Sequence, residues 1–234
     1  MLGDFLELSV DCEDVLGTVR FFEALGFTHL PTGDTWSHAY AVVSDGHINL
    51  GLHDYRFPSP SLTFVLPDLR RHVEALEATG VTFEFVKLAA DEFNEAGFLT
   101  PEGQIVTLLE ARTFPPPAMP PGPTLCGHFR ELRLPCAAPA ESAPFWERLG
   151  FVAMNDGDGT LLIRTGLSVR LRRAALAARP VMVFSDPEMP ALIEKLRFDG
   201  WTFSREVQDT EGRTLSAALA PPAGPEIELV TDED

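Results

Sequence analysis

The sequence is poor in cysteine and has no long hydrophobic run. It contains three cysteines in 234 residues, and none of them belongs to a Cys-x-x-Cys pair. This sparse, odd-numbered set excludes a disulfide scaffold. No apolar run approaches the roughly 20 residues that a membrane helix needs, and the acidic N-terminus lacks the basic start of a secretory signal. We therefore expect a cytoplasmic protein without a membrane span.

Positive charge is also scarce, since 18 Lys and Arg residues stand against 35 Asp and Glu residues, for a formal net charge of -17. Such a field repels phosphate backbones and anionic membrane surfaces, so we expect neither nucleic acid nor membrane as a partner. The same field would attract a cationic ligand, although an acidic surface can equally serve solubility alone. Phosphate-loop, dinucleotide-binding, hydrolase and zinc-protease motifs are missing from the sequence.

An internal repeat organises the chain. A helical stretch ends in Leu-Gly-Phe at residues 25–27 and again at 149–151, and 150 minus 26 gives an offset of 124. The same offset relates Phe5-Leu6-Glu7-Leu8 to Phe129-Arg130-Glu131-Leu132, because 131 minus 7 is also 124. A long unit that occurs only twice indicates a duplicated module rather than a solenoid. The cleft between copies is where we expect a ligand.

Periodicity predicts the same elements in each copy. Asp14 is a candidate N-cap, and Gly26 stands where a glycine ends a helix. In the first half we expect strands at 5–10, 36–43, 48–53, 62–66, 81–86, 97–100 and 105–110 and helices at 14–25 and 68–79. In the second half we expect the first strand and helix to repeat. We also expect strands at 161–163, 169–171, 181–185 and 226–230, a helix at 188–198, and a strand at 201–203 that corresponds to 81–83.

A proline-rich segment separates the copies. Residues 114–124 contain six prolines in eleven positions, which favours an extended, semi-rigid connector. A recognition ligand for another protein is the alternative. The predicted organisation is an N-terminal half at 1–113, a linker at 114–124 and a C-terminal half at 125–234.

The order of these elements resembles the vicinal oxygen chelate superfamily, which includes glyoxalase I, bleomycin-resistance proteins and extradiol dioxygenases. The resemblance covers nearly the whole chain. It is carried by the helix ends at 21–27 and 145–151, the strand–helix stretch at 62–81, the turn and strand Thr100-Pro101-Glu102-Gly103-Gln104-Ile105, and the C-terminal stretch at 222–229. It implies an α+β fold in which paired βαβββ modules form half-open, cup-shaped sheets, with two modules in each half.

The resemblance also implies where a metal would bind, namely on the first and last strands of paired modules. Those positions fall on Glu7 and Thr107 in the first half and on Glu131 and Glu228 in the second. A further ligand position, at the start of the middle strand, falls on Ser61 and Val181. No histidine occupies any of these positions, unlike the metalloenzymes of the superfamily.

Alternation turns Glu7 away from Leu6, Leu8 and Val10 and so toward the cup, and Glu228 is placed in the same way. Glu7, Glu131 and Glu228 are therefore candidate metal ligands. Carboxylates without imidazole suit Mg²⁺ or Mn²⁺ better than Zn²⁺. Ni²⁺ and Zn²⁺ are the other divalent metals that we consider. Two alternatives stay open, because strand carboxylates can be solvated side chains or can attract a cationic ligand without a metal.

Aromatic and imidazole side chains supply further candidates. Trp36, His38 and Tyr40 share one face of the expected strand, and His53 ends the next strand. They would line a ligand-binding site together with Glu7, Glu131, Glu228 and Thr107. The alternative is that they pack in the core or at a polar rim.

These features favour a small-molecule-binding protein of the glyoxalase and bleomycin-resistance type. It would sequester a ligand in a cup between modules without a cofactor, as a monomer or a homodimer. The competing hypothesis is a metal-dependent lyase or dioxygenase with a carboxylate-rich site.

Overall fold

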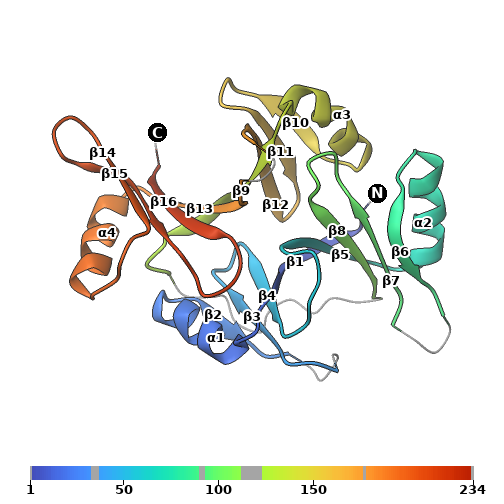
Figure 1. Ribbon diagram of the computed structural model, residues 1–234, viewed down its shortest axis with the longest axis horizontal. Helices are drawn as coiled ribbons and strands as arrows, with labels where there is room; N and C mark the ends of the chain where they lie inside the picture. Colours follow the sequence, from blue (N-terminus) through green and yellow to red (C-terminus); the bar gives the residue numbers. More distant parts are fainter. Residues whose placement is uncertain (1, 33–36, 90–92, 112–122, 176–177, 233–234) are drawn as a thin grey trace.

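The structure is a computed structural model that describes residues 2–32, 37–89, 93–111, 123–175 and 178–232. In this part of the chain the strands form two eight-stranded mixed sheets, and four helices lie around them (Figure 1). The predicted α+β class is confirmed. The two sheets come from the two halves of the sequence, so the tandem duplication is confirmed as well.

The first sheet has the strand order β2-β3-β4-β1-β5-β8-β7-β6. β1 pairs in parallel with β4, β5 pairs in parallel with β8, and an antiparallel β1–β5 pair joins the two modules. The elements are β1 (Asp4–Asp11), α1 (Val15–Ala24), β2 (Thr28–Leu30), β3 (Tyr40–Ser44), β4 (Asn49–His53), β5 (Ser61–Leu66), α2 (Leu69–Ala78), β6 (Phe83–Lys87), β7 (Glu95–Leu99) and β8 (Ile105–Glu110).

The second sheet repeats this order as β10-β11-β12-β9-β13-β16-β15-β14. Each sheet therefore consists of two βαβββ modules that form a half-open cup, as the sequence predicts. The elements are β9 (His128–Cys136), α3 (Pro139–Arg148), β10 (Val152–Asn155), β11 (Thr160–Arg164), β12 (Leu167–Arg173), β13 (Val181–Asp186), α4 (Met189–Phe198), β14 (Arg205–Gln208), β15 (Thr214–Leu219) and β16 (Glu226–Thr231).

Both first strands carry a bulge at the same place. The β1–β5 register shifts between Phe5 and Glu7, so Leu6 is the extra residue, and Arg130 is the extra residue in β9. The simple alternation expected for β1 is therefore wrong at its start. Phe5 lies on the apolar side against Phe64, at a centroid distance of 5.4 Å, whereas Glu7 lies on the opposite side.

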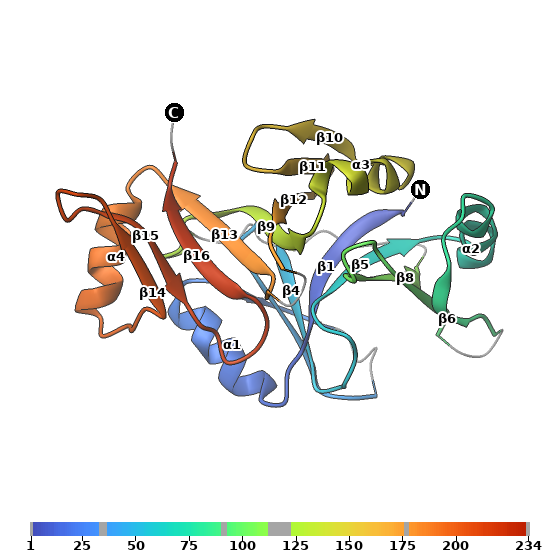
Figure 2. The same ribbon diagram turned by 45° about the horizontal axis from the view of Figure 1, so that its top comes forward.

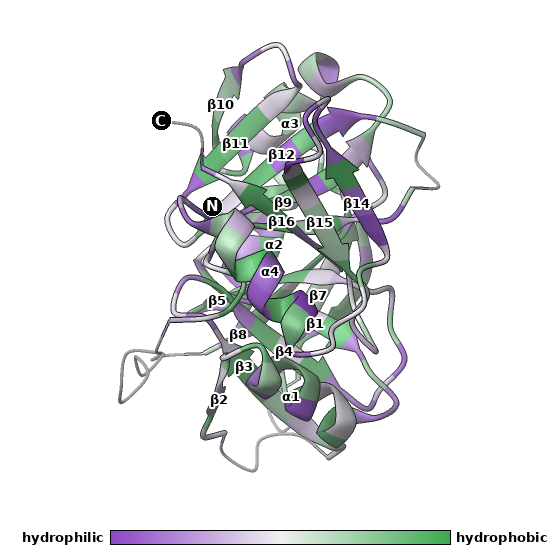
Figure 3. Ribbon diagram, turned by 90° about the vertical axis from the view of Figure 1, so that its left-hand side faces the viewer, coloured by the Kyte–Doolittle hydropathy of each residue, from purple (hydrophilic) through white to green (hydrophobic). Residues whose placement is uncertain are grey.

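The helices begin and end where the sequence predicts. The Asp14 side chain accepts a hydrogen bond from the Gly17 amide, and Asp68 does the same for Arg71 at the start of α2. Gly26 has a φ of 92°, the left-handed conformation that follows a helix end. Each helix turns its apolar side chains to a sheet, and Figure 3 shows α1 and α4 with both hydrophobic and hydrophilic segments.

Several strand boundaries differ from the prediction. β3 begins at Tyr40, so His38 precedes the strand, and Trp36 lies outside the described residues. Residues 201–203 form no strand; β14 begins at Arg205. The sequence analysis missed the edge strands β2 and β10 and also β15, because short strands give little periodicity. Most of the predicted linker, residues 114–122, lies outside the described part, so the domain boundaries stay a prediction.

Aromatic side chains join the two halves at two places. Phe21 of α1 packs edge-on against Trp201 at 5.2 Å, and Phe27 packs against Phe184 at 5.7 Å. At the other junction Phe98 of β7 packs against Phe145 of α3 at 6.4 Å. Figure 1 shows the end of the β7–β8 hairpin beside α3, and Figure 2 shows α1 beside the strands of the last module. The first module thus contacts the fourth, and the second contacts the third.

The helices are short. Each of the four in the described residues has ten residues, about half of what a membrane span requires. None of them is long and apolar enough to cross a membrane.

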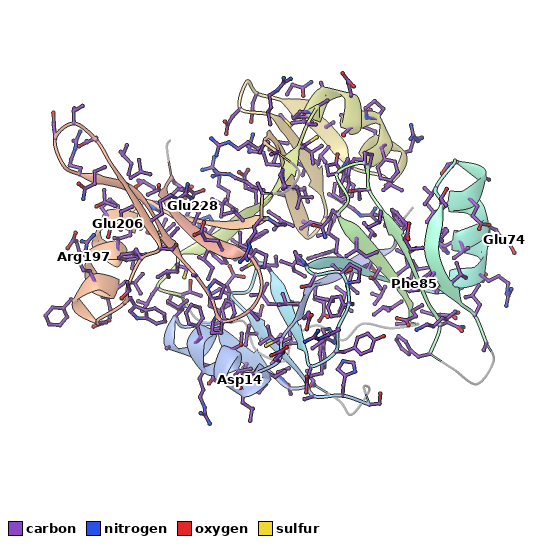
Figure 4. The ribbon with its side chains drawn as sticks, viewed as in Figure 1. Asp14, Glu74, Phe85, Arg197, Glu206 and Glu228 are labelled. Carbon is purple, nitrogen blue, oxygen red and sulfur yellow. The ribbon has the colours of Figure 1, made fainter. Side chains whose placement is uncertain are left out.

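The caps of α1 and α3 allow a matched stability test (Figure 4 labels Asp14). We expect Asp14→Ala to lower the free energy of unfolding by about 1 kcal/mol, because the Gly17 amide loses its acceptor. The equivalent position of α3 is Ala138, which makes no side-chain cap bond, so Ala138→Asp should raise stability. Urea unfolding measures both, with the exposed Glu23→Ala as control. Equal midpoints for wild type and Asp14→Ala would contradict the assignment.

Candidate functional site

The polar face of the first sheet gathers around Glu7. The register places Glu7 of β1 beside Thr63 of β5, and Thr63 beside Thr107 of β8. Glu7 is 2% exposed, so the alternative that it is a solvated strand carboxylate does not hold. A buried carboxylate requires hydrogen-bond donors around it, and its neighbours supply them. We call Glu7, Ser9, His38, Tyr40, His53 and Thr63 the Glu7 cluster.

Three side chains donate to the Glu7 carboxylate. Tyr40 Oη donates to Oε2 at 2.6 Å, and Ser9 Oγ donates to Oε1 at 2.8 Å. His53 Nε2 lies 3.0 Å from Oε1 and must carry the proton of that bond, because an ionised carboxylate only accepts. Ser9 also bonds Thr63 at 2.7 Å, which fixes the hydroxyl between two strands.

A glycine makes room for this arrangement. The Glu7 side chain extends over Gly51 of β4, where an added Cβ would lie 2.1 Å from the nearer carboxylate oxygen. Gly51 pairs with Ser9 in the parallel register, and His53 follows two residues later on the same face. Only a residue without a side chain at position 51 lets Glu7 reach His53 and Tyr40.

The cluster continues outward through two imidazoles. His53 Nδ1 lies 3.0 Å from His38 Nε2, so Glu7, His53 and His38 form a hydrogen-bonded chain from a buried to a half-buried position. Burial, followed by repulsion from His53, lowers the pKa of His38, against an opposing effect of Asp54. His38 is therefore neutral near pH 7. This chain can pass a proton between Glu7 and the rim.

Burial raises the pKa of Tyr40 far above its ordinary value, and the charge and hydrogen bond of Glu7 add to the effect. The phenol thus keeps its proton and remains a donor. Ser61 and Thr107, which the sequence analysis singled out, bond each other at 2.7 Å. The register shows that Thr63, rather than Ser61, lies in one row with Glu7 and Thr107.

The second sheet carries charges in the equivalent place. Glu131 pairs with Val183, and Val183 with Glu228, so Val183 stands where the sequence analysis considered Val181. Arg133 bridges the two glutamates: its Nε lies 2.8 Å from Glu131, and its Nη1 donates to Glu228. Figure 4 labels Glu228 on this sheet.

Two more arginines complete this arginine–carboxylate network. Arg170 Nε donates to both oxygens of Glu131, at 2.9 and 2.8 Å, and its Nη1 donates to Asp156 at 2.5 Å. Arg205 Nη2 donates to Glu228 at 3.1 Å. The hydrogen bond from Arg170 lowers the pKa of Asp156. Guanidinium groups thus neutralise the carboxylates of the second cup.

The three candidate metal ligands are not brought together. Glu131 and Glu228 share the arginine–carboxylate network, whereas Glu7 lies on the other sheet. A divalent cation at Glu131 and Glu228 would have to displace a buried arginine, so this donor set does not fit a metal ion. In the described residues no three His, Cys, Asp or Glu side chains are placed to hold one. Metal binding by Glu7, Glu131 and Glu228 stays an untested prediction.

Sequence reasoning found Glu7, Tyr40, His38 and His53 but missed Ser9, Thr63, Arg133 and Arg170. Ser9 and Arg133 stand two residues after the two glutamates, so strand alternation could have placed them on the same face. Arg170 interrupts the apolar run Val169-Arg170-Leu171, which is a detectable sign of a buried charge partner.

Comparisons with known proteins agree with the fold. No family model matches the sequence, and no curated protein matches it significantly. Among solved structures, a catechol 2,3-dioxygenase matches with a TM-score of 0.63 and 13% identity over 99% of this chain and 88% of that one.

Two further structures match in the same way. The 2,2',3-trihydroxybiphenyl 1,2-dioxygenase of Sphingomonas wittichii strain RW1 has a TM-score of 0.61 and 16% identity over 99% and 91% of the two chains. The Mn(II)-bound glyoxalase of Novosphingobium aromaticivorans has a TM-score of 0.60 and 12% identity over 100% and 83%. The chain therefore has the vicinal oxygen chelate fold. At such low identity the matches show the fold alone.

The pKa of Tyr40 tests the geometry of the Glu7 cluster. In Glu7→Gln we expect this pKa to fall, because the charge of the carboxylate is lost and a neutral amide oxygen accepts more weakly from the phenol, yet to stay above the ordinary value, because burial persists. Since the folded pKa exceeds the unfolded value of about 10, the phenol stabilises the fold fully below about pH 10 and loses this contribution as pH rises. Glu7→Gln should lose less stability over that range. Tyrosine Cζ chemical shifts measure the pKa, with the exposed Glu84→Gln as control.

Proposed function

We propose that the chain binds a small organic molecule at the cup of the first sheet, at the Glu7 cluster. The observation that carries this proposal is the buried Glu7 carboxylate, linked through His53 to the half-buried His38. The cluster combines strong acceptors and donors on the face that the helices leave uncovered. A few convergent polar groups of this kind are typical of small-molecule sites.

Aromatic rings at the rim support a planar ligand. His38 stacks on Tyr55 at 5.5 Å and 25°, and Tyr55 stacks on Phe57 at 6.3 Å and 20°. Tyr55 is 57% exposed, so part of its ring faces solvent beside the cluster. A partly exposed aromatic ring near a carboxylate favours an aromatic cation, which gains both stacking and electrostatic attraction.

The charges of the molecule support the same ligand class. The net charge of -17 attracts cations and disfavours nucleic acids and anionic membranes as partners. The lowered pKa of His38 keeps this imidazole at the rim neutral near pH 7. The role we propose is sequestration of an aromatic cation, as the resemblance to bleomycin-resistance proteins implies.

Proflavine, a planar aromatic cation, provides a direct test. We expect saturable binding in EDTA, measured by fluorescence anisotropy, that weakens at high salt. Glu7→Gln and Tyr55→Ala should each weaken it by about tenfold or about 1.4 kcal/mol, since each removes one attractive contact. Gly51→Ala should weaken binding as well, because the added methyl displaces the carboxylate without removing its charge.

The exposed Glu84→Gln is the matched control, because it removes the same charge from the molecule at a distant strand. If proflavine bound with equal affinity to wild type, Glu7→Gln and Tyr55→Ala, the cup of the first sheet would not be the binding site.

A metal-dependent lyase or dioxygenase is the second candidate. Its support is that Glu7, His38 and His53 are one carboxylate and two imidazoles, a donor set known from non-haem iron sites. In the structure, however, these three side chains form a hydrogen-bonded chain, and both ring nitrogens of His53 are bonded to its neighbours. This arrangement does not fit a metal ion. We derive no reaction step from it.

Metal analysis separates the two candidates. After incubation with Mn²⁺, Mg²⁺, Ni²⁺ or Zn²⁺ and dialysis, we expect no stoichiometric metal in the wild type, because the donor nitrogens and oxygens are engaged with one another. Stoichiometric metal that is lost in both Glu7→Gln and His53→Gln would overturn this expectation and favour the enzyme.

A further inference from the structure

A cavity of about 220 Å³ lies between the two halves, away from the Glu7 cluster. The first half contributes the β4–β5 loop and the β7–β8 turn, and the second half contributes β9 together with Ala178 and Pro180, which precede β13. Four prolines form much of its wall: Pro58, Pro60, Pro135 and Pro180. The cavity has room for a small organic molecule, because one water molecule occupies about 30 Å³.

A buried glutamate is one of the residues that line this cavity. Glu102 lines it and is 8% exposed. Its Oε2 accepts a hydrogen bond from the Trp146 indole at 3.3 Å, and its Oε1 accepts a weak bond from the Cys136 thiol at 3.7 Å. Both donors are neutral, and no Lys, Arg or His of the described residues forms an ion pair with Glu102. The negative charge is thus buried without a cationic partner from that part of the chain.

The rest of the lining is short of donors. Proline has no backbone N–H, so the four prolines present only apolar rings and carbonyl groups. The Gln104 amide nitrogen already donates to the carbonyls of Pro60 and Ile105. The Ser59 hydroxyl accepts from the Asp11 amide at 3.0 Å and keeps its own O–H as a donor. A cavity that is rich in acceptors and apolar surface matches a ligand with a cationic donor group and a short hydrocarbon part.

The internal repeat provides a comparison. Pro101-Glu102-Gly103 corresponds to Pro222-Ala223-Gly224 in the second half. There an alanine replaces the glutamate, and a Cβ at Gly224 would lie 3.2 Å from Val10, so that turn packs closely on β1. Phe22, whose side chain has no N–H, stands where Trp146 stands in the other copy. The carboxylate and its indole donor therefore occur together at one of the two related junctions.

We propose that the cavity at Glu102 binds a small alkylammonium ion, with the ammonium group on the Glu102 carboxylate and the alkyl chain against the prolines. The ligand would contact both halves at once and would hold them together. This site is separate from the Glu7 cluster, so the proposal does not depend on the function proposed for the first cup.

n-Butylammonium chloride is the probe, titrated into the ¹⁵N-labelled full chain. We expect a saturable shift of the Trp146 indole N–H signal, assigned with Trp146→Phe, since this group is bonded to Glu102. In Glu102→Gln the affinity should fall by about tenfold or more, because a charge-assisted hydrogen bond is replaced by a neutral one. The substitution keeps an acceptor for Trp146 and nearly the same volume, so the chain should fold.

Four outcomes would overturn the proposal. Equal shifts in wild type and Glu102→Gln would overturn it, as would an unchanged indole signal in the wild type. n-Butanol has the same hydrocarbon part without the charge. If the wild type bound n-butanol as tightly as n-butylammonium, the proposal would also be overturned, and this test does not require any variant to fold. Glu7→Gln should leave butylammonium binding unchanged; loss of binding in that variant would place the ligand in the first cup instead.

Discussion

Each half of the molecule buries a glutamate on its first strand, and each sheet is arranged around the need to stabilise that carboxylate. Glu7 and Glu131 are both 2% exposed. A carboxylate taken out of water costs several kcal/mol unless donors or cations surround it. The first sheet supplies a phenol, a hydroxyl and an imidazole, and the second supplies two arginines. The two cups consequently differ in chemistry although their backbones correspond.

One strand position accounts for much of that difference. In the first sheet Ser9 pairs with Gly51, and in the second the corresponding pair is Arg133 and Arg170. Gly51 leaves space through which Glu7 reaches the residues of β3 and β4. Arg170 fills that space and binds its glutamate directly. The second cup is thereby occupied by internal ion pairs. In the first cup the carboxylate is bonded by a phenol, a hydroxyl and an imidazole instead, and the exposed Tyr55 ring lies beside His38 of this cluster.

Local features of the sequence predicted most of the fold, because caps, turns and helix ends depend on neighbouring residues. Asp14, Gly26 and the 124-residue offset fixed the helices and the duplication. The bulge at Leu6 and the row of Glu7 with Thr63 depend on pairing with a distant strand, which no local pattern records. For the same reason Arg133 and Arg170 were missed as partners of Glu131.

The contacts between the halves also occur at equivalent positions of the two copies that carry different side chains. One junction is apolar and aromatic, with Phe21 against Trp201. The other contains a buried carboxylate at Glu102 in addition to its aromatic contact. An alanine, as at position 223, would avoid the desolvation cost and still allow the turn to pack. Since the cost is present in one copy and avoided in the other, packing of the halves does not by itself require a glutamate at this turn, which agrees with the ligand-binding role that we propose for Glu102.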